Sequence, residues 1–294
     1  MKILENHEKV IIDNIGVDTL DLLRMKSTSL RKALLGMIYC AKTGHTGGSL
    51  SSVDILTVLY YHVLRIDPKH PKDPNRDRFI MSKGHSVEAL YVILADKGFF
   101  PLEELKTFSK FGSRLIGHPS VKVPGVELNT GALGHGLSCS VGMALAAQRD
   151  RSAVRVFCLM GDGEQAEGSV WEAAMAASNF QLDNLTAIID RNRLQISGNT
   201  ETVMKLDSLQ EKWEAFGWDV HTVDGHDFSA LTKAFDAPQV LGKPRMIIAE
   251  TLKGKGVSYM QDNAKWHHGV PDDQQYHLAL EELESYMQEV RGHE

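Results

Sequence analysis

The chain has 294 residues and a mass of 32.6 kDa, which suits one large domain or two small ones. Its 32 Lys and Arg against 38 Asp and Glu give a net charge of −6, which argues against a general nucleic-acid-binding protein. Hydrophobic residues make up 43% of the chain, yet no apolar run approaches the roughly 20 residues of a membrane span. Three cysteines without a CxxC pair favour a reducing compartment, so we expect a cytoplasmic protein.

The first half of the sequence predicts helices joined by glycine-rich or polar loops. Apolar residues recur at helical spacing and predict helices over 20–41, 53–66, 86–97, 101–110 and 137–147. A polar loop over 67–78 carries three of the nine prolines. We expect the region up to about residue 42 to be a helical extension of the main domain.

The hydrophobic pattern differs in the second half of the sequence, where short apolar runs alternate with helical patterns. The apolar runs predict strands over 154–160, 185–190, 218–223 and 245–251. Helices are predicted over 169–179, 206–216, 228–235 and 272–290. Such alternation is typical of βαβ units, so the sequence predicts an α/β fold whose parallel sheet is flanked by helices.

Two oxygen-bearing side chains follow successive predicted strands. Asp162 follows the first strand, and Asn192 follows the second. Ligands bind at the carboxyl ends of parallel strands, so both side chains point into one crevice if these strands are neighbours. A carboxylate and an amide oxygen suit Mg²⁺, and Gly161 and Gly163 let the backbone approach a phosphate. The pattern indicates Mg²⁺ clamping a diphosphate, although the same residues also fit a helix cap and a turn.

The segment GDGEQA also fits the G-x-G-x-x-G/A fingerprint of dinucleotide-binding sites. Asp162 stands between its two glycines, where it places a negative charge against a metal-free pyrophosphate. This repulsion disfavours an NAD site unless a cation bridges the two groups.

Histidines that directly follow a glycine form a second signal. His45, His85, His118 and His135 lie in the predicted loops GHTGGS, SKGHS, IGHPS and GALGHG, and His226 follows later. A preceding glycine permits sharp loop geometry that presents an imidazole to a ligand. The group therefore indicates a site that orients hydroxyls, binds phosphate or moves protons. The sequence has no HExxH motif and no cysteine pair that would support a zinc site.

Longer segments around these residues form an ordered set along the chain. They are GHTGGSLSSVDIL, DRFIMSKGH, GHP, GVELNTGALGHGLS, and GDG with a downstream DRNRLQISG. Their order resembles that of the transketolase family, in which GDG with a later Asn is the thiamine-diphosphate signature. The resemblance runs from about residue 26 to about residue 269 and covers only the N-terminal portion of a transketolase. It implies a thiamine-diphosphate-binding fold, with 1–294 as a single diphosphate-binding domain.

The resemblance also implies the roles of individual residues. The Asp162 and Asn192 side chains and the Leu194 carbonyl are expected to hold Mg²⁺, with Ca²⁺ or Mn²⁺ as alternatives. Contacts to thiamine diphosphate are expected from His85, Gly131, Leu133, Gly161, Asp162, Gly163, Asn192, and His267 or His268. Catalytic roles are expected for His45 and His118 at the sugar, for His267 or His268, and for Glu167 in a carboxylate chain between active sites. His135 stands where many full-length members of the family carry Gln.

The implied reaction moves a two-carbon ketol unit from a ketose phosphate to an aldose phosphate. About 25 residues follow the last motif, too few for the pyrimidine-binding domain of a full-length enzyme. We therefore expect the N-terminal subunit of a split transketolase, active only with a C-terminal partner subunit in an α₂β₂ assembly, with no nucleic-acid or membrane partner. Alternatives are the α subunit of a 2-oxo acid dehydrogenase, a transketolase for an unusual sugar, or a non-catalytic homologue.

Overall fold

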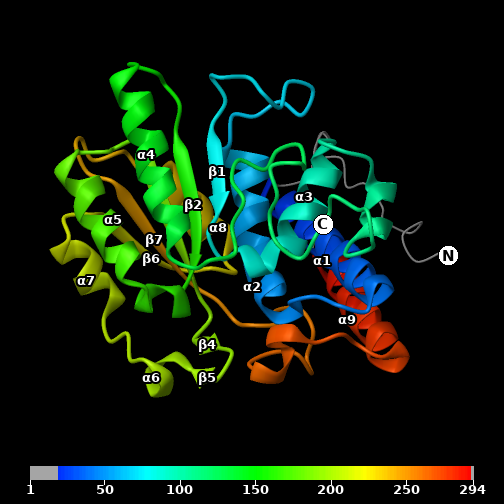
Figure 1. Ribbon diagram of the computed structural model, residues 1–294. Coiled ribbons are helices and arrows are strands. Elements are labelled where there is room, and N and C mark those ends of the chain that lie inside the picture. Colours follow the sequence, from blue (N-terminus) through cyan, green and yellow to red (C-terminus); the bar gives the residue numbers. More distant parts are fainter. Residues whose placement is uncertain (1–18, 293–294) are drawn as a thin grey trace.

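A central parallel sheet organises the molecule. The computed structural model describes residues 19–292, and within them five parallel strands lie in the order β1-β2-β3-β7-β6 (Figure 1). They are β1 (Arg78–Met81), β2 (Val156–Gly161), β3 (Leu185–Arg191), β6 (Asp219–Asp224) and β7 (Arg245–Glu250). The predicted α/β fold with a parallel sheet is confirmed.

Side chains of the central strands alternate between two hydrophobic clusters. On β2, Val156 and Cys158 belong to one cluster, while Phe157 and Leu159 belong to the other. Successive residues of a strand point to opposite faces of a sheet, and here both faces are covered. This double burial explains why β2 reads as a continuous apolar run rather than an alternating one.

Helices cover both faces of the sheet (Figure 1). One face carries α4 (His135–Arg149), α5 (Gly168–Asn179) and α7 (Leu209–Ala215). On the other side lie α2 (Thr46–Val58) and α8 (Phe228–Asp236); α1 (Thr19–Ala41) and α3 (Val87–Lys97) pack on α2, and α9 (Asp273–Gly292) packs on α1. Beyond the carboxyl end of β3, a hairpin of β4 (Leu194–Gln195) and β5 (Gly198–Asn199) leads into α6 (Thr200–Val203).

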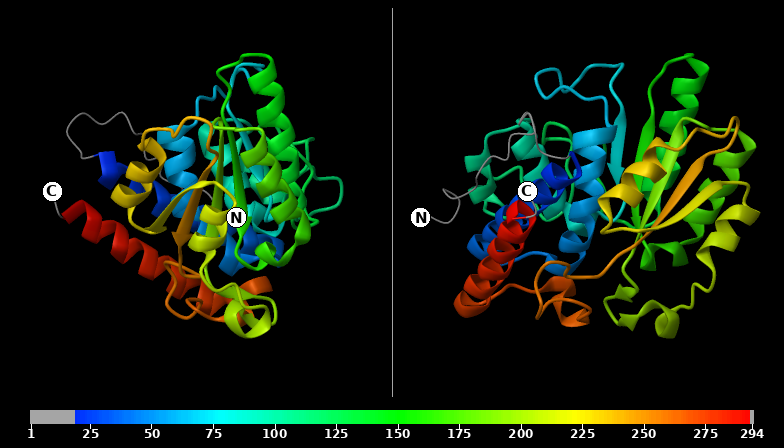
Figure 2. Two further views of the ribbon diagram at one scale, coloured as in Figure 1. Left: turned by 90° about the vertical axis from the view of Figure 1, so that its left-hand side faces the viewer. Right: turned by 180° about the vertical axis from the view of Figure 1, so that it is seen from behind.

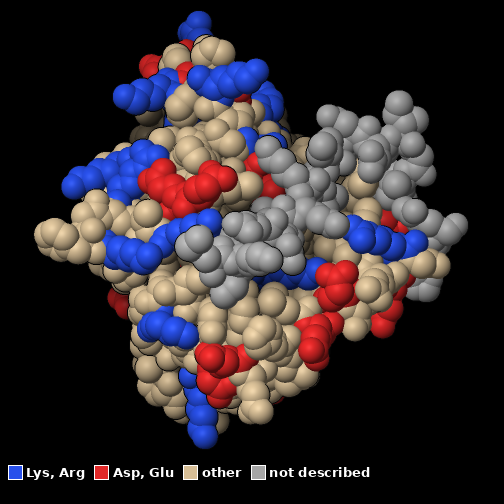
Figure 3. Space-filling view, turned by 90° about the vertical axis from the view of Figure 1, so that its right-hand side faces the viewer, with Lys and Arg blue, Asp and Glu red and all other residues tan. Residues whose placement is uncertain are grey.

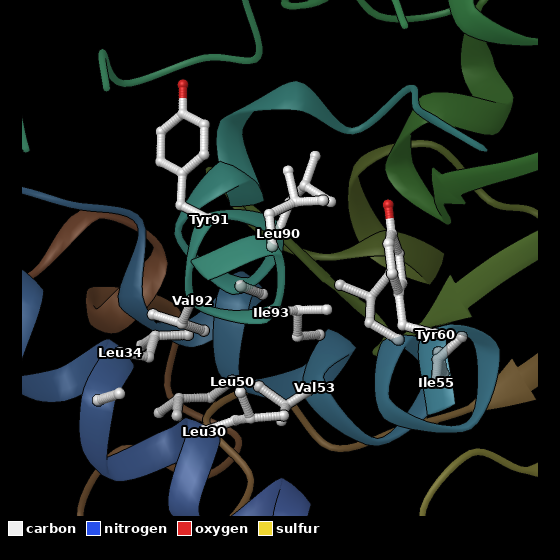
Figure 4. Close-up of a cluster of buried hydrophobic side chains, with 14 of the residues drawn as sticks. Leu30, Leu34, Leu50, Val53, Ile55, Tyr60, Leu90, Tyr91, Val92 and Ile93 are labelled. Atoms are coloured by element: carbon white, nitrogen blue, oxygen red, sulfur yellow. The ribbon is translucent and has the colours of Figure 1, made fainter. Parts of the chain in front are cut away.

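The larger hydrophobic cluster lies where α1, α2 and α3 meet. Figure 4 shows side chains of these helices pointing toward one another, among them Leu30, Leu34, Leu50, Val53 and Ile93. All five are fully buried, and each such side chain contributes roughly 1.5–3 kcal/mol relative to exposure. The helical extension predicted up to about residue 42 therefore includes α1, which is part of this core. α9 packs alongside α1 (Figure 2), and residues 1–18 of the predicted extension lie outside the described residues.

The start of α2 differs from the prediction. α2 begins at Thr46, whereas the sequence predicted a glycine-rich loop and a helix over 53–66. Gly47 and Gly48 lie in the first turn of α2. Neighbouring segments approach this turn so closely that a side chain would not fit at either position. A Cβ atom on Gly47 would lie 2.8 Å from the Trp266 carbonyl oxygen. The glycine pair therefore marks close packing rather than a loop.

Two shorter elements also differ from the prediction. β1 was missed, because its four residues directly follow the proline-rich loop and are too few to show a periodic pattern. The helix predicted over 101–110 is a 3-10 helix, Leu102–Thr107.

Charged side chains of both signs share the surface. On the face shown in Figure 3, Lys and Arg side chains are interspersed with Asp and Glu. One ion pair, Lys32 with Glu284, joins α1 to α9. Among residues 19–292, none of the helices combines the length and apolar character that a membrane span requires.

Gly136, in the first turn of α4, lets this helix approach the end of β1. A Cβ atom there would lie 2.4 Å from the Ser82 side chain, so Gly136→Ala is expected to destabilise the chain by about 1–3 kcal/mol. Gly142→Ala on the same helix is the control, because its Cβ atom would meet no described atom within 4 Å and alanine favours a helix by about 1 kcal/mol. Urea unfolding measures both variants, and equal stabilities would contradict the close approach.

Candidate functional site

A cavity of about 400 Å³ lies at the carboxyl ends of the strands. The predicted site residues that line it are His45, His85, Gly131, Leu133, Gly161, Asp162, Gly163, Asn192, Leu194 and His267. They come from loops that are far apart in the sequence, and the parallel sheet brings them together because its strands end at one edge.

Asp162 lies directly after β2, and its carboxylate faces the loop that follows β3. It accepts hydrogen bonds from the backbone N–H groups of Gly163 at 2.7 Å and Arg193 at 2.5 Å. The Arg191 guanidinium donates to it at 3.3 Å. Burial, together with the charge of Asp190, raises the pKa of the Asp162 carboxyl. A divalent cation at this carboxylate would oppose that shift, since it favours the charged form.

Asn192 and Leu194 add two further oxygens to the same wall. Asn192 Oδ1 accepts the Leu194 N–H at 3.1 Å, and the Leu194 carbonyl accepts from Lys253 Nζ at 2.9 Å. A carboxylate, an amide oxygen and a carbonyl are hard ligands that suit Mg²⁺, which completes its octahedron with phosphate and water oxygens. Across the described residues, no group of three or more His, Cys, Asp or Glu side chains could hold a metal ion. The oxygen donors at this wall are of the kind that a divalent cation takes together with ligand oxygens.

Two buried lysines, which the sequence patterns did not indicate, also line the cavity. Lys83 Nζ pairs with Asp190 and donates to the Gly48 carbonyl at 3.1 Å, while Lys253 Nζ lies 3.0 Å from His267 Nδ1. Burial, and then the charge of Lys83, lowers the pKa of Lys253 to about 8. An anionic diphosphate would oppose that shift, so the lysines fit such a group. Lys253 follows β7 closely, and applying the strand-end rule to that strand would have found it.

Histidines from several loops gather at the rim of the cavity. The ring centroid of His45 lies 5.5 Å from that of His85, 6.2 Å from His118, 5.6 Å from His267 and 4.7 Å from His268. Burial lowers the pKa of His45 to about 4, that of His267 to about 3, and that of His85 well below its usual value. These three rings are therefore neutral at pH 7, and each can donate one hydrogen bond and accept another.

The structure distinguishes histidines that the sequence could not rank. His267 lines the cavity, whereas His268 stands beside the ring of His45 outside the cavity lining. His135 is exposed at the start of α4. His226 bonds to Asp54 and does not join the cluster.

Two glycines and two glutamates lie at or near the walls of the cavity. A Cβ atom on Gly131 would lie 3.0 Å from the His118 ring, so the glycine lets that ring approach the cavity. Glu167 is exposed at the start of α5, outside the cavity lining. Glu164, which the sequence patterns also did not indicate, lines the cavity and accepts the Gly134 N–H at 2.8 Å. Burial raises the pKa of Glu164.

Comparison with known proteins identifies the family. The family model described as "Transketolase, thiamine diphosphate binding domain" matches residues 25–283. The chain belongs to the transketolase family. It is 52% identical to an apulose-4-phosphate transketolase subunit of Phocaeicola vulgatus over 275 residues, which cover 93% of this chain and 97% of that protein. It is 41% identical to a 6-deoxy-6-sulfo-D-fructose transketolase subunit of Clostridium sp., with 89% of this chain and 96% of that protein covered.

Solved transketolases share the fold. The Pichia stipitis transketolase in complex with sedoheptulose-7-phosphate superposes with a TM-score of 0.82 and 29% identity, over 94% of this chain and 45% of that one. The chain thus spans about half the length of the solved transketolases that it matches. The predicted thiamine-diphosphate-binding fold is confirmed, and the family match favours this cofactor over the dinucleotide alternative.

Glu88 supports the cavity by bonding to the backbone of His45. It is fully buried at the start of α3, and it accepts the His45 N–H and the Ser49 hydroxyl, each at 2.8 Å. Burial raises the pKa of the Glu88 carboxyl from 4.5 to about 7. The folded chain therefore holds this proton at pH values where the unfolded chain releases it.

The contribution of Glu88 to the stability of the chain should consequently fall as the pH rises from about 4.5 to 7, because the folded state holds the Glu88 proton there and the unfolded state does not. Glu88→Gln removes this dependence, so its stability relative to wild type should rise by on the order of 3 kcal/mol between pH 5 and pH 8. Urea unfolding at the two pH values measures the difference, with Glu281→Gln on the exposed face of α9 as control. A difference that is the same at both pH values would contradict the raised pKa.

Proposed function

We propose that this chain is the N-terminal, thiamine-diphosphate-binding subunit of a two-chain transketolase that moves a two-carbon ketol unit from a ketose phosphate to an aldose phosphate. The observation that carries the proposal is one cavity with metal-suited oxygens on one wall, a buried lysine on another, and neutral histidines at its rim. We propose that 1–294 form one diphosphate-binding domain, supported by the packing of α9 against α1.

The proposed cofactor contacts follow from the walls of the cavity. The Asp162 and Asn192 side chains and the Leu194 carbonyl hold Mg²⁺, for which Ca²⁺ or Mn²⁺ can substitute. The glycines that flank Asp162, with His85 and Lys253, would hold the diphosphate, and Gly131 and Leu133 would contact the rings of the cofactor. A glycine is needed at this wall, because a Cβ atom on Gly163 would lie 2.9 Å from the Gln195 amide oxygen. When bound, thiamine diphosphate supplies the electron sink for cleavage of the C–C bond.

The chain's own residues position the sugar and move protons. His45 and His118 would face the sugar, together with His267 or His268, and an imidazole placed there can bond to a sugar hydroxyl and take part in its proton transfer. His267 is favoured over His268 because it lines the cavity. A positioned acid–base group of this kind contributes about 10²–10⁴-fold to the rate. We assign Glu167 to a carboxylate chain between active sites, supported by its place beside Gly134 near the cavity wall.

The identity of the sugar has a second candidate. A pentose phosphate is the default substrate of the proposed reaction. The 52% identity to a relative named for apulose 4-phosphate, over nearly the whole of both chains, supports a branched or otherwise unusual ketose phosphate instead.

A cytoplasmic location is also proposed, supported by the free thiols of Cys40, Cys139 and Cys158.

The partner provides the main test of the proposal. Relatives of similar length are named as transketolase subunits, and single-chain transketolases are about twice as long, so we propose a C-terminal partner in an α₂β₂ assembly. The purified chain alone should show no transketolase activity, and adding the product of the neighbouring gene should restore it. The assay is ketol transfer with the two purified chains, separately and mixed. Full activity of the chain alone would overturn the two-chain proposal.

Loss of one metal ligand should abolish cofactor binding. Asp162→Ala removes a charge and a hard ligand, so Mg²⁺-dependent binding of thiamine diphosphate should be lost. Asp162→Asn, which keeps the shape and one acceptor oxygen, separates loss of the metal from collapse of the loop. Calorimetry with the partner present measures the affinity, and Asp207→Ala, at an exposed ion pair with Lys205, is the control. Unchanged affinity in both Asp162 variants would refute the metal assignment.

A further inference from the structure

His226 stands apart from the histidine cluster and bonds through both ring nitrogens. It lies in the loop between β6 and α8, and its Nδ1 is 2.8 Å from the Asp54 carboxylate. Its Nε2 accepts the backbone N–H of Leu252 at 2.8 Å. An acceptor at Nε2 requires the proton on Nδ1, so one neutral tautomer serves both bonds.

Leu252 directly precedes Lys253, whose ammonium lines the cofactor cavity. The segment that carries the lysine leaves the end of β7 and is bonded again two residues later, where the Gly254 N–H donates to the Gly47 carbonyl of α2 at 3.0 Å. His226 and Gly47 therefore bond to the backbone on the two sides of Lys253.

The loop that carries His226 is built to approach β7. The Gly225 N–H donates to the Glu250 carbonyl at 2.7 Å, and a Cβ atom on Gly225 would lie 2.5 Å from the Thr251 side chain. A glycine is therefore needed for the loop to come this close. The next residue, His226, is thereby brought within reach of the Leu252 N–H.

Asp54 fixes the other side of the ring. It is buried on α2 and pairs with Arg31 of α1 at 2.7 Å. The first turn of the same helix supplies Gly48 to the cavity. The ring of His226 thus joins α2 to the backbone next to Lys253.

We propose that His226 is a positioning residue that holds the Lys253 ammonium in place for the diphosphate, a role that rests on the proposed cofactor site. His226 does not line the cavity, so it would act through the Leu252 backbone.

Two amide substitutions separate the bonds of His226. Asn places its amide nitrogen near the position of Nδ1 and keeps a donor to Asp54, but it loses the acceptor for the Leu252 N–H. Gln places its carbonyl oxygen near the position of Nε2 and keeps that acceptor. His226→Asn should weaken binding of thiamine diphosphate with Mg²⁺ about three- to tenfold, the effect of one lost hydrogen bond, while His226→Gln stays close to wild type. Calorimetry on the full chain with its partner measures both, with His221→Asn, at a half-exposed His–Asp pair on β6, as control.

A double-variant cycle tests whether the effect passes through Lys253. In a Lys253→Met background, His226→Asn should cause no further loss of affinity, because the group that it positions is gone. Additive losses in the double variant, or equal affinities of the Asn and Gln variants, would overturn the proposal.

Amide hydrogen exchange gives a readout that needs no cofactor. The Leu252 N–H should be protected in the wild-type chain and in His226→Gln, and it should exchange faster in His226→Asn. An unprotected Leu252 N–H in the wild type would overturn the proposal even if the variants fail to fold. If this exchange pattern holds but the wild type does not bind thiamine diphosphate, the proposed cofactor site is refuted. The hydrogen bond from the Leu252 N–H to His226 is then still confirmed.

Discussion

The buried ion pair between Asp190, at the end of β3, and Lys83, beyond β1, is the interaction on which the site depends. The same carboxylate accepts the Ser51 hydroxyl of α2 at 2.7 Å and the Thr251 hydroxyl beyond β7. Burial alone would raise the pKa of Asp190, but Lys83 lowers it to about 2, so the carboxylate stays charged at pH 7. Removing one partner of such a pair costs about 3–5 kcal/mol. Four segments of the cavity are therefore held together by one charge.

Two opposite pKa shifts at the cavity bear on the proposed binding of a diphosphate together with a cation. Burial raises the pKa of Asp162 and lowers that of Lys253, because it destabilises the charged form of each group. A cation alone would relieve only the first shift, and an anion alone would relieve only the second. A diphosphate with a divalent cation relieves both, which gives cation and anion a physical reason to bind together.

The sequence predicted those features that depend on local pattern. Continuous apolar runs located β2, β3 and β7, and the strand-end rule placed Asp162 and Asn192 at one cavity. Features set by distant contacts were not predictable in this way. The glycines that open α2 resemble a loop in sequence, and their role is visible only once Trp266 is seen to pack against them. Likewise, the glycine–histidine pattern could not separate His85, which lines the cavity, from His226, which bonds to the Leu252 backbone beyond β7.

The position of β7 controls when the sheet can form on the ribosome. Among the described strands of the sheet, β7 comes last in sequence, yet it lies between β3 and β6 and pairs with both. Until this segment emerges, β3 has an open edge and β6 has no neighbour in the sheet. Unpaired edges invite aggregation, and a nascent chain must carry them until β7 has left the ribosome. The central sheet is therefore completed only late in synthesis.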